Sequence, residues 1–165
     1  MRKIIFVLAA VVVAAVAVAQ IVKPPAPPKT FASAAEIAAL LAKAKSEHKD
    51  GQPTVFEPVL SLNPYGANME YRTGVGPAAV HEKEAELFVV LDGSGVLTTG
   101  GKLVKERRSN GENLTGTGIE GGQTQPVAKG DMLIVPENTP HWFSTINGSL
   151  VVVSMHVPRQ AGAKP

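Results

Sequence analysis

The chain has 165 residues, with 16 basic and 14 acidic side chains and no cysteine. A chain of this length forms one domain with a proper hydrophobic core rather than two. The absence of cysteine excludes disulfide bonds and a lipid-anchored lipoprotein, and the near balance of charges argues against the basic face that nucleic-acid binding requires. The composition therefore indicates a small single-domain protein without a nucleic-acid partner.

The first 19 residues have the pattern of a secretory signal peptide. Arg2 and Lys3 precede an apolar run from Ile4 to Ala19, and this run ends in Ala17-Val18-Ala19. A basic start, an apolar middle and an A-x-A exit are the three parts of such a peptide. We therefore expect residues 1–19 to be cleaved and the mature protein to be exported, either to a periplasm or out of the cell.

An uncleaved membrane anchor is the alternative for this segment. Ile21 and Val22 extend the apolar run toward the length that spans a bilayer. In both cases residues 23–165 lie outside the cytoplasm, because the basic residues stay inside. Cleavage would remove Arg2 and Lys3 and leave 14 basic and 14 acidic side chains, so the exported protein would be nearly neutral.

A proline-rich spacer and one helix follow. Residues 20–32 contain the run KPPAPPK, which is expected to be extended. A helix is expected over residues 33–50, because Ser33 can cap its first turn together with Glu36, and Gly51 can end it. The apolar side chains of this helix form a narrow stripe that needs a surface to lie on: Ile37, Leu40 and Leu41.

Beyond the helix the pattern changes to short strands separated by Gly, Pro and Asn. The expected strands are Val55–Leu62, Asn68–Thr73, Glu86–Leu91, Gly95–Thr99, Met132–Val135, His141–Ile146 and Leu150–Val157. The pair Asn147-Gly148 predicts a tight hairpin between the last two, and residues 100–126 predict a long loop or an irregular hairpin. Many short strands without a second long helix favour an all-β sandwich or barrel over residues 54–158, with a tail at 159–165.

One stretch, HEKEAELFVVLDGSG at residues 81–95, places an ionisable cluster directly before an apolar strand. A buried carboxylate is costly unless a cation or hydrogen-bond donors meet it. The acidic and histidine side chains of this cluster therefore either lie at a solvated rim or surround something positive.

A second stretch, GDMLIVPENTPHWF at residues 130–143, combines a turn, a buried strand and a tight reversal that ends in His141. Together the two stretches resemble the motifs of the cupin superfamily. Glu86, six residues and Gly93 fit the end of the first cupin motif. Gly130, Pro136 and His141 fit the second, with Asn138 in the position where Gly is usual. Asn tolerates the left-handed conformation that this position requires. The resemblance implies a cupin-type double-stranded β-helix, or jelly-roll barrel, preceded by one N-terminal α-helix.

The resemblance also implies a metal site. Carried over residue by residue, it assigns His81, Glu86 and His141 as ligands of a divalent metal ion such as Fe, Mn, Zn or Ni. Two His and one carboxylate form a sound ligand set for such ions. The first motif-one His would fall at Ala79 and is missing. Glu82 is an alternate ligand for that place.

The strand geometry raises one objection to this assignment. Positions 81 and 86 differ by an odd number, so a regular strand would point them to opposite faces. A bulge or loop across residues 82–85 would remove the conflict, and such irregularities are common beside active sites. Without a metal, His81 would be a rim residue, Glu86 would accept hydrogen bonds from backbone donors, and His141 would be a packed core histidine.

Six side chains are candidates for the surrounding pocket: Tyr71, Arg72, Phe88, Trp142, Phe143 and His156. On the strand NMEYRT, Tyr71 and Arg72 belong to opposite alternating sets, so their orientations are open. An inward Arg72 could clamp the carboxylate of a small organic acid. An inward His156 would be a pocket residue or a proton carrier.

Two functions follow from these observations. The first is an exported metal-dependent enzyme that acts on a small organic molecule by oxygenase, isomerase or lyase chemistry. The second is a non-catalytic small-ligand-binding or scaffold cupin without metal, because a fold does not choose a function. The apolar outer positions Leu87, Val89 and Leu91 need cover from the helix or a second subunit, and we expect a homodimer.

Overall fold

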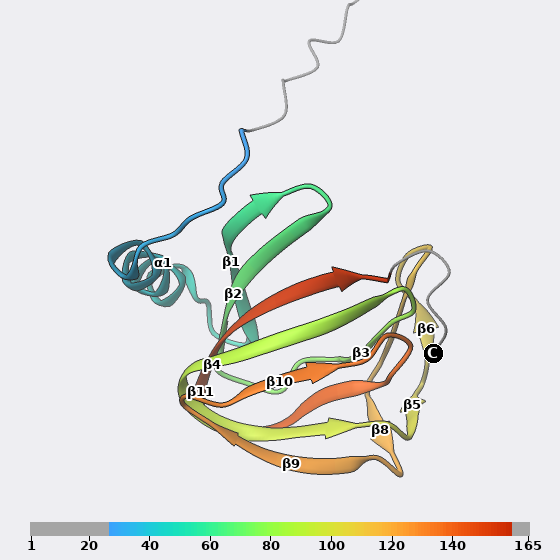
Figure 1. Ribbon diagram of the computed structural model, residues 1–165. Coiled ribbons are helices and arrows are strands. Elements are labelled where there is room, and N and C mark those ends of the chain that lie inside the picture. The colour runs from blue at the N-terminus through green and yellow to red at the C-terminus, as the bar shows by residue number, and fades with distance from the viewer. Residues whose placement is uncertain (1–26, 160–165) are drawn as a thin grey trace, which may run out of the picture.

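The computed structural model describes residues 27–159. The expected signal peptide, the first part of the spacer and nearly all of the tail lie outside this range. The elements in chain order are α1 (Ala34–Glu47), β1 (Thr54–Leu62), β2 (Tyr65–Arg72), β3 (Ala78–His81), β4 (Glu84–Thr99), β5 (Lys102–Val104), β6 (Arg107–Arg108), β7 (Asn113–Gly116), β8 (Gly118–Glu120), β9 (Gln123–Ala128), β10 (Met132–Val135) and β11 (His141–Pro158). Figure 1 shows the helix beside a β-barrel. Across the described residues, no helix has the length and apolar character needed to cross a membrane.

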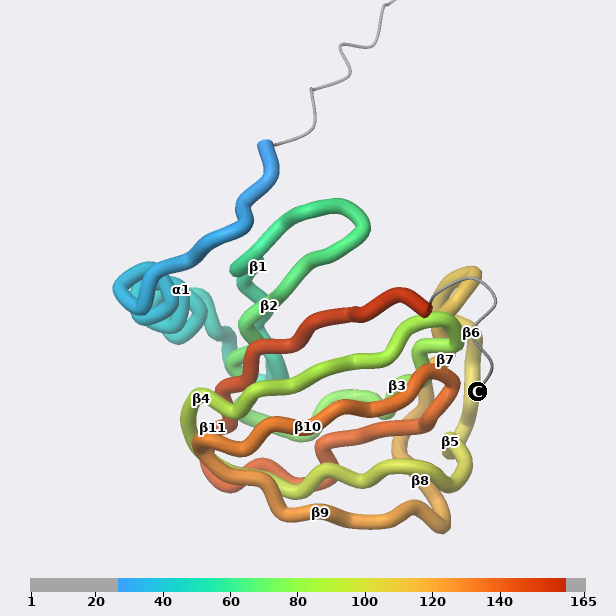
Figure 2. The backbone as a smooth tube through the Cα atoms, viewed as in Figure 1, coloured from blue at the N-terminus to red at the C-terminus, as the bar shows by residue number. Residues whose placement is uncertain are grey.

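The strands form two layers that share their two longest members. In one layer the order is β1, β2, the C-terminal half of β11, the N-terminal half of β4, and β10. In the other it is β9, the C-terminal half of β4, the N-terminal half of β11, β3, β7 and β6. The bends of β4 and β11 between the layers can be followed in Figure 2. This arrangement confirms the expected all-β jelly-roll barrel with one preceding helix.

The hairpin predicted at Asn147-Gly148 is wrong. The segments on either side of this pair belong to β11 and do not pair with each other. Both pair with β4, from His141↔Thr99 to Pro158↔Glu84, with a shift of register between Ile146 and Leu150. Long-range pairing with β4 therefore turns this pair into a bulge at the bend, where Gly148 takes a φ of 74°.

Gly93 marks the same bend on β4, which runs through both strands expected at 86–91 and 95–99. Its φ is 77°, and a Cβ built there would lie 2.0 Å from the backbone oxygen of Ser149. Only glycine lets the two strands approach this closely.

The main hydrophobic core lies between the two layers. Its buried members come from both: Phe88, Val90, Val135, Leu150 and Val152 from one, and Leu97, Val127 and Phe143 from the other. This core fills one end of the barrel, while polar side chains enter the interior at the other end.

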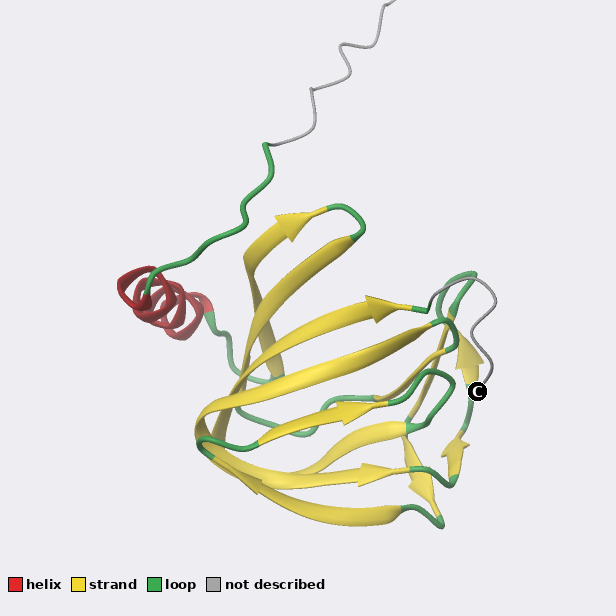
Figure 3. Cartoon of the chain, viewed as in Figure 1, coloured by secondary structure: helices red, strands yellow, loops and turns green. Residues whose placement is uncertain are grey.

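Helix α1 covers part of the outer face of the first layer (Figure 3). Ser33 and Glu36 form the expected capping box. The stripe of Ile37, Leu40 and Leu41 packs on a second buried cluster formed by β1, β2 and β11: Val59, Ala67, Met69 and Val151. The helix is held at its other side by an ion pair of 2.7 Å between Lys43 Nζ and the buried Glu57 Oε2.

The region expected to be a long loop or irregular hairpin, residues 100–126, contains several short strands. β5 pairs with β8, and β7 pairs with β3 and β6. The charged run at residues 105–108 is exposed.

Candidate metal centre

A sharp bend between two strands brings the motif-one residues together. β3 ends at His81, the chain bends at Glu82 and Lys83, and β4 begins at Glu84. This break in the strand resolves the parity objection, because His81 and Glu86 no longer belong to one regular strand. Both side chains enter the same end of the barrel.

The second motif is tied to the first through the backbone. Asn138 has a φ of 56°, the left-handed conformation expected of the residue that replaces Gly. In this geometry its backbone N–H donates to the carbonyl oxygen of His81 over 2.7 Å. The reversal therefore fixes the start of β11, and with it His141, against the end of β3.

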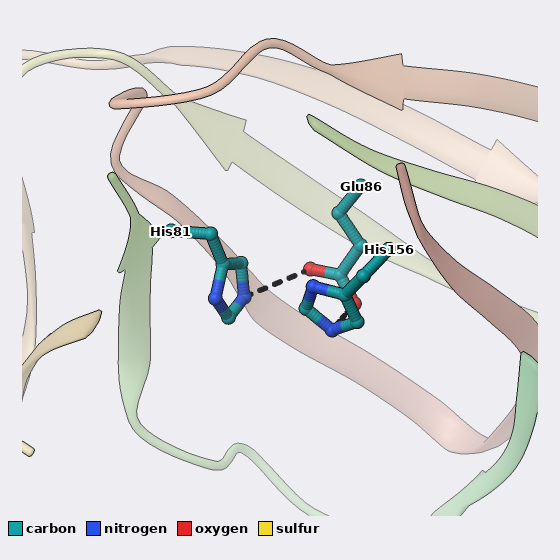
Figure 4. Close-up of side chains that lie close together, drawn as sticks. All are labelled: His81, Glu86 and His156. Carbon is teal, nitrogen blue, oxygen red and sulfur yellow. Dashed lines mark ion pairs between the residues drawn. The ribbon is translucent and has the colours of Figure 1, made fainter. Parts of the chain in front are cut away.

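Three imidazoles surround the carboxylate of Glu86. Nε2 of His81 lies 3.2 Å and Nε2 of His141 lies 3.0 Å from Oε2 of Glu86, and Nε2 of His156 lies 3.6 Å from Oε1. Figure 4 shows His81 and His156 converging on the two oxygens of this carboxylate. The side chain of Glu86 is only 7 % exposed, so the imidazoles replace the water that a carboxylate normally requires.

Two of the three imidazoles are oriented by their other ring nitrogen. Nδ1 of His81 donates to Oδ1 of Asn113 over 2.8 Å, and Nδ1 of His141 donates to the carbonyl oxygen of Thr139 over 3.1 Å. A hydrogen bond at Nδ1 leaves Nε2 as the free lone pair of a neutral imidazole. This is the arrangement in which histidines bind metal ions.

His156 supplies the third imidazole from a strand outside both cupin motifs. It stands directly opposite Glu86 in the pairing of β11 with β4, and its ring centroid lies 4.4 Å from that of His81. His156 does not occupy the position of the missing motif-one His. That position is Ala79, which stands opposite His141 on β3. The sequence therefore lacks a motif histidine, while the folded site still holds three imidazoles and one carboxylate.

Nδ1 of His156 is buried and forms no hydrogen bond with any residue between 27 and 159. It lies 3.1 Å from Oε2 of Glu84, close enough for an ion pair, but the angle does not allow a hydrogen bond. A buried polar nitrogen without a partner is rare and indicates a missing ligand or a functional role. Nδ1 of His156 is therefore held by charge alone, while Nε2 of the same ring faces Glu86.

The electrostatics of the cluster favour charge separation in the absence of metal. Burial raises the pKa of Glu86, but hydrogen bonds from His141 and His81 and the nearby charges of His141 and His156 outweigh it and hold the pKa far below its usual range. Burial likewise lowers the pKa of His81, but its bonds to Glu86 and Asn113 and the charges of Glu86 and Glu84 raise it overall. The carboxylate therefore remains ionised and able to bind a cation.

Glu82 does not take part in the cluster, and its assignment as an alternate ligand is wrong. Its two carboxylate oxygens accept hydrogen bonds of 2.7 and 3.0 Å from the guanidinium of Arg108 at the surface. The bend that brings His81 and Glu86 together turns Glu82 outward. The parity argument that proposed Glu82 assumed a regular strand through this point.

Above the cluster lies a cavity of about 340 Å³. Five of the six pocket candidates line it: Arg72, Phe88, Trp142, Phe143 and His156. Tyr71 does not, which corrects its assignment. It faces the helix side of the barrel, where its ring packs against His48 at a centroid distance of 5.9 Å.

Sequence reasoning did not single out four polar residues of the cavity wall: Thr54, Asn68, Glu70 and Ser154. Asn68 and Glu70 share the face of Arg72 on β2, so the alternation that includes an inward Arg72 would have found them. Ser154 has no signal of its own in the sequence. It becomes recognisable only because β11 pairs Ser154 with Asn68.

The donor set fits a divalent transition metal. His81, Glu86 and His156 offer ligand atoms that all lie within 4.8 Å of one another, and His141 contacts the same carboxylate. Imidazole nitrogens with one carboxylate suit Fe, Mn, Zn or Ni better than they suit Mg or Ca, which prefer oxygen ligands. His141 is not one of the three residues that meet this distance limit, and it joins the set through its contact of 3.0 Å with Glu86.

Comparison with known proteins gives similarity in structure alone. No protein-family profile matches the sequence, and no curated protein matches it. Among solved structures, a candidate mannose-6-phosphate isomerase from Ralstonia eutropha has a TM-score of 0.48 and 15% identity, covering 69% of this chain and 94% of that one. KdgF from Halomonas sp. has a TM-score of 0.49 and 18% identity, covering 70% and 92%.

A conserved protein with a double-stranded β-helix domain from Klebsiella pneumoniae is also similar, with a TM-score of 0.48 and 16% identity, covering 72% of this chain and 83% of that one. Scores and identities this low do not transfer an activity. The chemistry of the site therefore has to be argued from its own residues.

Proposed function

We propose that this protein is an exported single-domain cupin that binds a divalent metal ion and acts on a small organic molecule. The ligands are His81, Glu86, His141 and His156. The observation that carries the proposal is the convergence of three imidazoles on one buried carboxylate, at distances from 3.0 to 3.6 Å, beside a cavity.

The residues around the site have separate roles in this function. A bound divalent ion would supply Lewis acidity to a substrate oxygen, which serves oxygenase, isomerase or lyase chemistry. The four side chains hold the ion, and Asn113 and Thr139 fix the imidazole orientations. The apolar walls exclude water from the reacting atoms. One of these walls is fixed by a hydrogen bond of 2.8 Å from Trp142 Nε1 to the carbonyl oxygen of Gly76.

A non-catalytic small-ligand-binding cupin without metal is the second candidate. One observation favours it: Oε2 of Glu86 already receives hydrogen bonds from two imidazoles over 3.0 and 3.2 Å without any ion. In that case the cluster would be an internal ion-pair network that stabilises the barrel, and the cavity alone would bind the ligand.

Elemental analysis of residues 20–165, purified without chelator, decides between the two. We expect near-stoichiometric iron, manganese, nickel or zinc in the wild type and none in His141→Ala. In His156→Ala the affinity for the metal should fall about tenfold or more. Glu82→Ala is the matched control, because Glu82 belongs to the same segment but bonds to Arg108 at the surface. Absence of metal from the wild type, even after reconstitution, would establish the binding module instead.

Export is tested separately with the full chain. The sequence of residues 1–19 supports cleavage after Ala19. Expression in a bacterial host followed by mass spectrometry of the N-terminus should give a chain that begins at Gln20. An intact N-terminus in the membrane fraction would support the anchor, and an intact N-terminus in the cytoplasm would contradict export.

A further inference from the structure

The cavity has a second polar region on β2, built by Glu70 and Arg72 on the wall beside the metal ligands. Both are largely withdrawn from solvent, since their side chains are 3 % and 14 % exposed. A buried ion pair does little for stability compared with apolar packing, so its presence in a cavity wall calls for another explanation.

The guanidinium of Arg72 is held rigidly by two neighbours. Its Nε donates to Oε2 of Glu70 over 2.7 Å, and its Nη2 lies 2.5 Å from the same oxygen. One face of the group lies over the ring of Phe143, with 4.7 Å between the guanidinium carbon and the ring centroid. Arg72 is therefore fixed in position before any ligand arrives.

The opposite edge of this guanidinium is free to bind. The contacts to Glu70 use the edge formed by Nε and Nη2, and the described part of the chain provides no hydrogen bond to Nη1. Gly76 lies beside Nη1, and a Cβ built on it would stand 3.8 Å from this nitrogen, at an ordinary contact distance. The edge formed by Nη1 and Nη2 presents parallel N–H donors, whose geometry matches a carboxylate.

The charges in the cavity favour an anion. Among the residues that line the cavity, Arg72 and Glu70 neutralise each other, and a divalent ion held by Glu86 would leave one excess positive charge. Glu84 lies 3.1 Å from His156 but is not part of the lining, and its side chain is 33 % exposed, so solvent screens its charge. A ligand with one negative charge would complete the balance, and the low local dielectric strengthens its attraction.

We propose that Arg72 binds a carboxylate of the substrate and that Glu70 is a positioning residue that orients Arg72. The substrate is then a small organic acid with a carboxylate at one end and oxygen ligands for the metal at the other. This inference rests on the proposed function, since the second end of the substrate requires a bound metal.

Calorimetric titration of the metal-loaded protein with paired compounds tests the inference. The probes are malate and 2-hydroxyglutarate, each compared with the compound whose distal carboxylate is replaced by an amide. The two acids differ in chain length, so they test two distances between the metal and Arg72. We expect the wild type to bind the better-fitting acid at least about tenfold more tightly than its amide, because a bidentate charged contact is lost in the amide.

Variants of Arg72 test whether this residue causes the preference for the acid over the amide. Arg72→Gln should bind acid and amide equally, and Arg72→Lys should recover only part of the preference, because an ammonium lacks the planar fork. Since Arg72→Gln leaves Glu70 buried and unpaired, the double variant Glu70→Gln with Arg72→Gln keeps the test valid if the single variant does not fold.

Metal content, measured on the same samples, separates the inference from the proposed function. Unchanged metal content together with loss of the preference in Arg72→Gln supports both the inference and the proposed function. An equal preference in the wild type and in the folded Arg72 variants would place the carboxylate at the metal and overturn the role of Arg72. Equal binding of acid and amide by the metal-loaded wild type would overturn the inference alone. Absence of metal in the wild type would overturn the proposed function.

Discussion

Under the proposed function, binding of a metal ion would make Glu86 and His81 exchange partners, and their protonation would change with it. In the metal-free protein His81 has a raised pKa, because its bonds to Glu86 and Asn113 and the charges of Glu86 and Glu84 outweigh the effect of burial. A metal ion requires the neutral imidazole instead. The same residue therefore stabilises the fold in opposite pH ranges in the two forms.

This opposition predicts a reversal of the pH dependence of stability. A raised pKa contributes stability that is complete below the unfolded value of about 6.5 and is lost as the pH rises through the folded value. Between about pH 6 and pH 8.5, the melting temperature of the metal-free protein should therefore fall by more in the wild type than in His81→Asn. The stabilisation produced by added Zn or Mn should increase over the same range. Parallel curves for wild type and His81→Asn would contradict the role of His81.

Asn113 is the residue that selects the tautomer of His81, through the hydrogen bond of 2.8 Å at Nδ1. Removal of such an orienting partner typically weakens metal binding by about 10- to 100-fold. We expect Asn113→Ala to reduce the affinity for Zn by this amount, measured by competition with a chelator of known affinity. Glu112→Ala is the control, because the Glu112 carboxylate pairs with the exposed Lys83 and with no other described residue, and the variant's affinity should equal that of the wild type. Equal affinity in the Asn113 variant would show that His81 needs no orienting partner.

At the scale of the elements, the crossing of β4 and β11 determines the shape of the barrel. Both strands bend where they pass between the layers, and the register shifts there. The glycines at the two bends differ in their surroundings. A Cβ on Gly93 would meet the backbone of Ser149, whereas a Cβ on Gly148 would meet nothing within 4 Å.

These two glycines form a matched pair for a test of the crossing. Both have positive φ, 77° and 74°, so alanine at either position lowers the free energy of unfolding by about 1 kcal/mol through the backbone conformation alone. Gly93→Ala should cost several kcal/mol more in the free energy of unfolding, roughly 3 kcal/mol or greater in total, because two backbones must separate. Denaturant unfolding measures both values. Equal losses would mean that the strands at the crossing can move apart without cost.

Local signals predicted the elements well and their partners poorly. The capping box, the alternation of β2 and the break after His81 follow from neighbouring residues, and the structure agrees with them. Asn147-Gly148 has the sequence of a hairpin, but its strands find a better partner in β4. His156 joins the site only because β11 returns beside Glu86, a relation that no local pattern contains.

At the scale of the whole molecule, helix α1 leaves part of the outer face of the first layer uncovered. The helix packs on the buried cluster formed by β1, β2 and β11, against which Val153 and Met155 also pack. Farther along the same layer, β10 presents Met132 and Ile134, which are 66 % and 60 % exposed. They stand opposite Val89 and Leu87 of β4, so the apolar surface is continuous across both strands.

This outer face of β4 and β10 is where we expect a second copy of the chain to pack. Burial of each exposed Met or Ile would contribute about 1.5–3 kcal/mol to association. Among the described strands β10 pairs only with β4, so its other edge is open.

Light scattering of residues 20–165 should give a homodimer. Ile134→Glu should give a monomer that retains its metal, because Ile134 faces away from the cavity. Leu62→Glu, a charge placed on an exposed apolar residue of the β1–β2 hairpin, is the control and should remain a dimer. A monomeric wild type at working concentration would contradict the assembly while leaving the proposed metal site untouched, because all four proposed ligands lie in one chain.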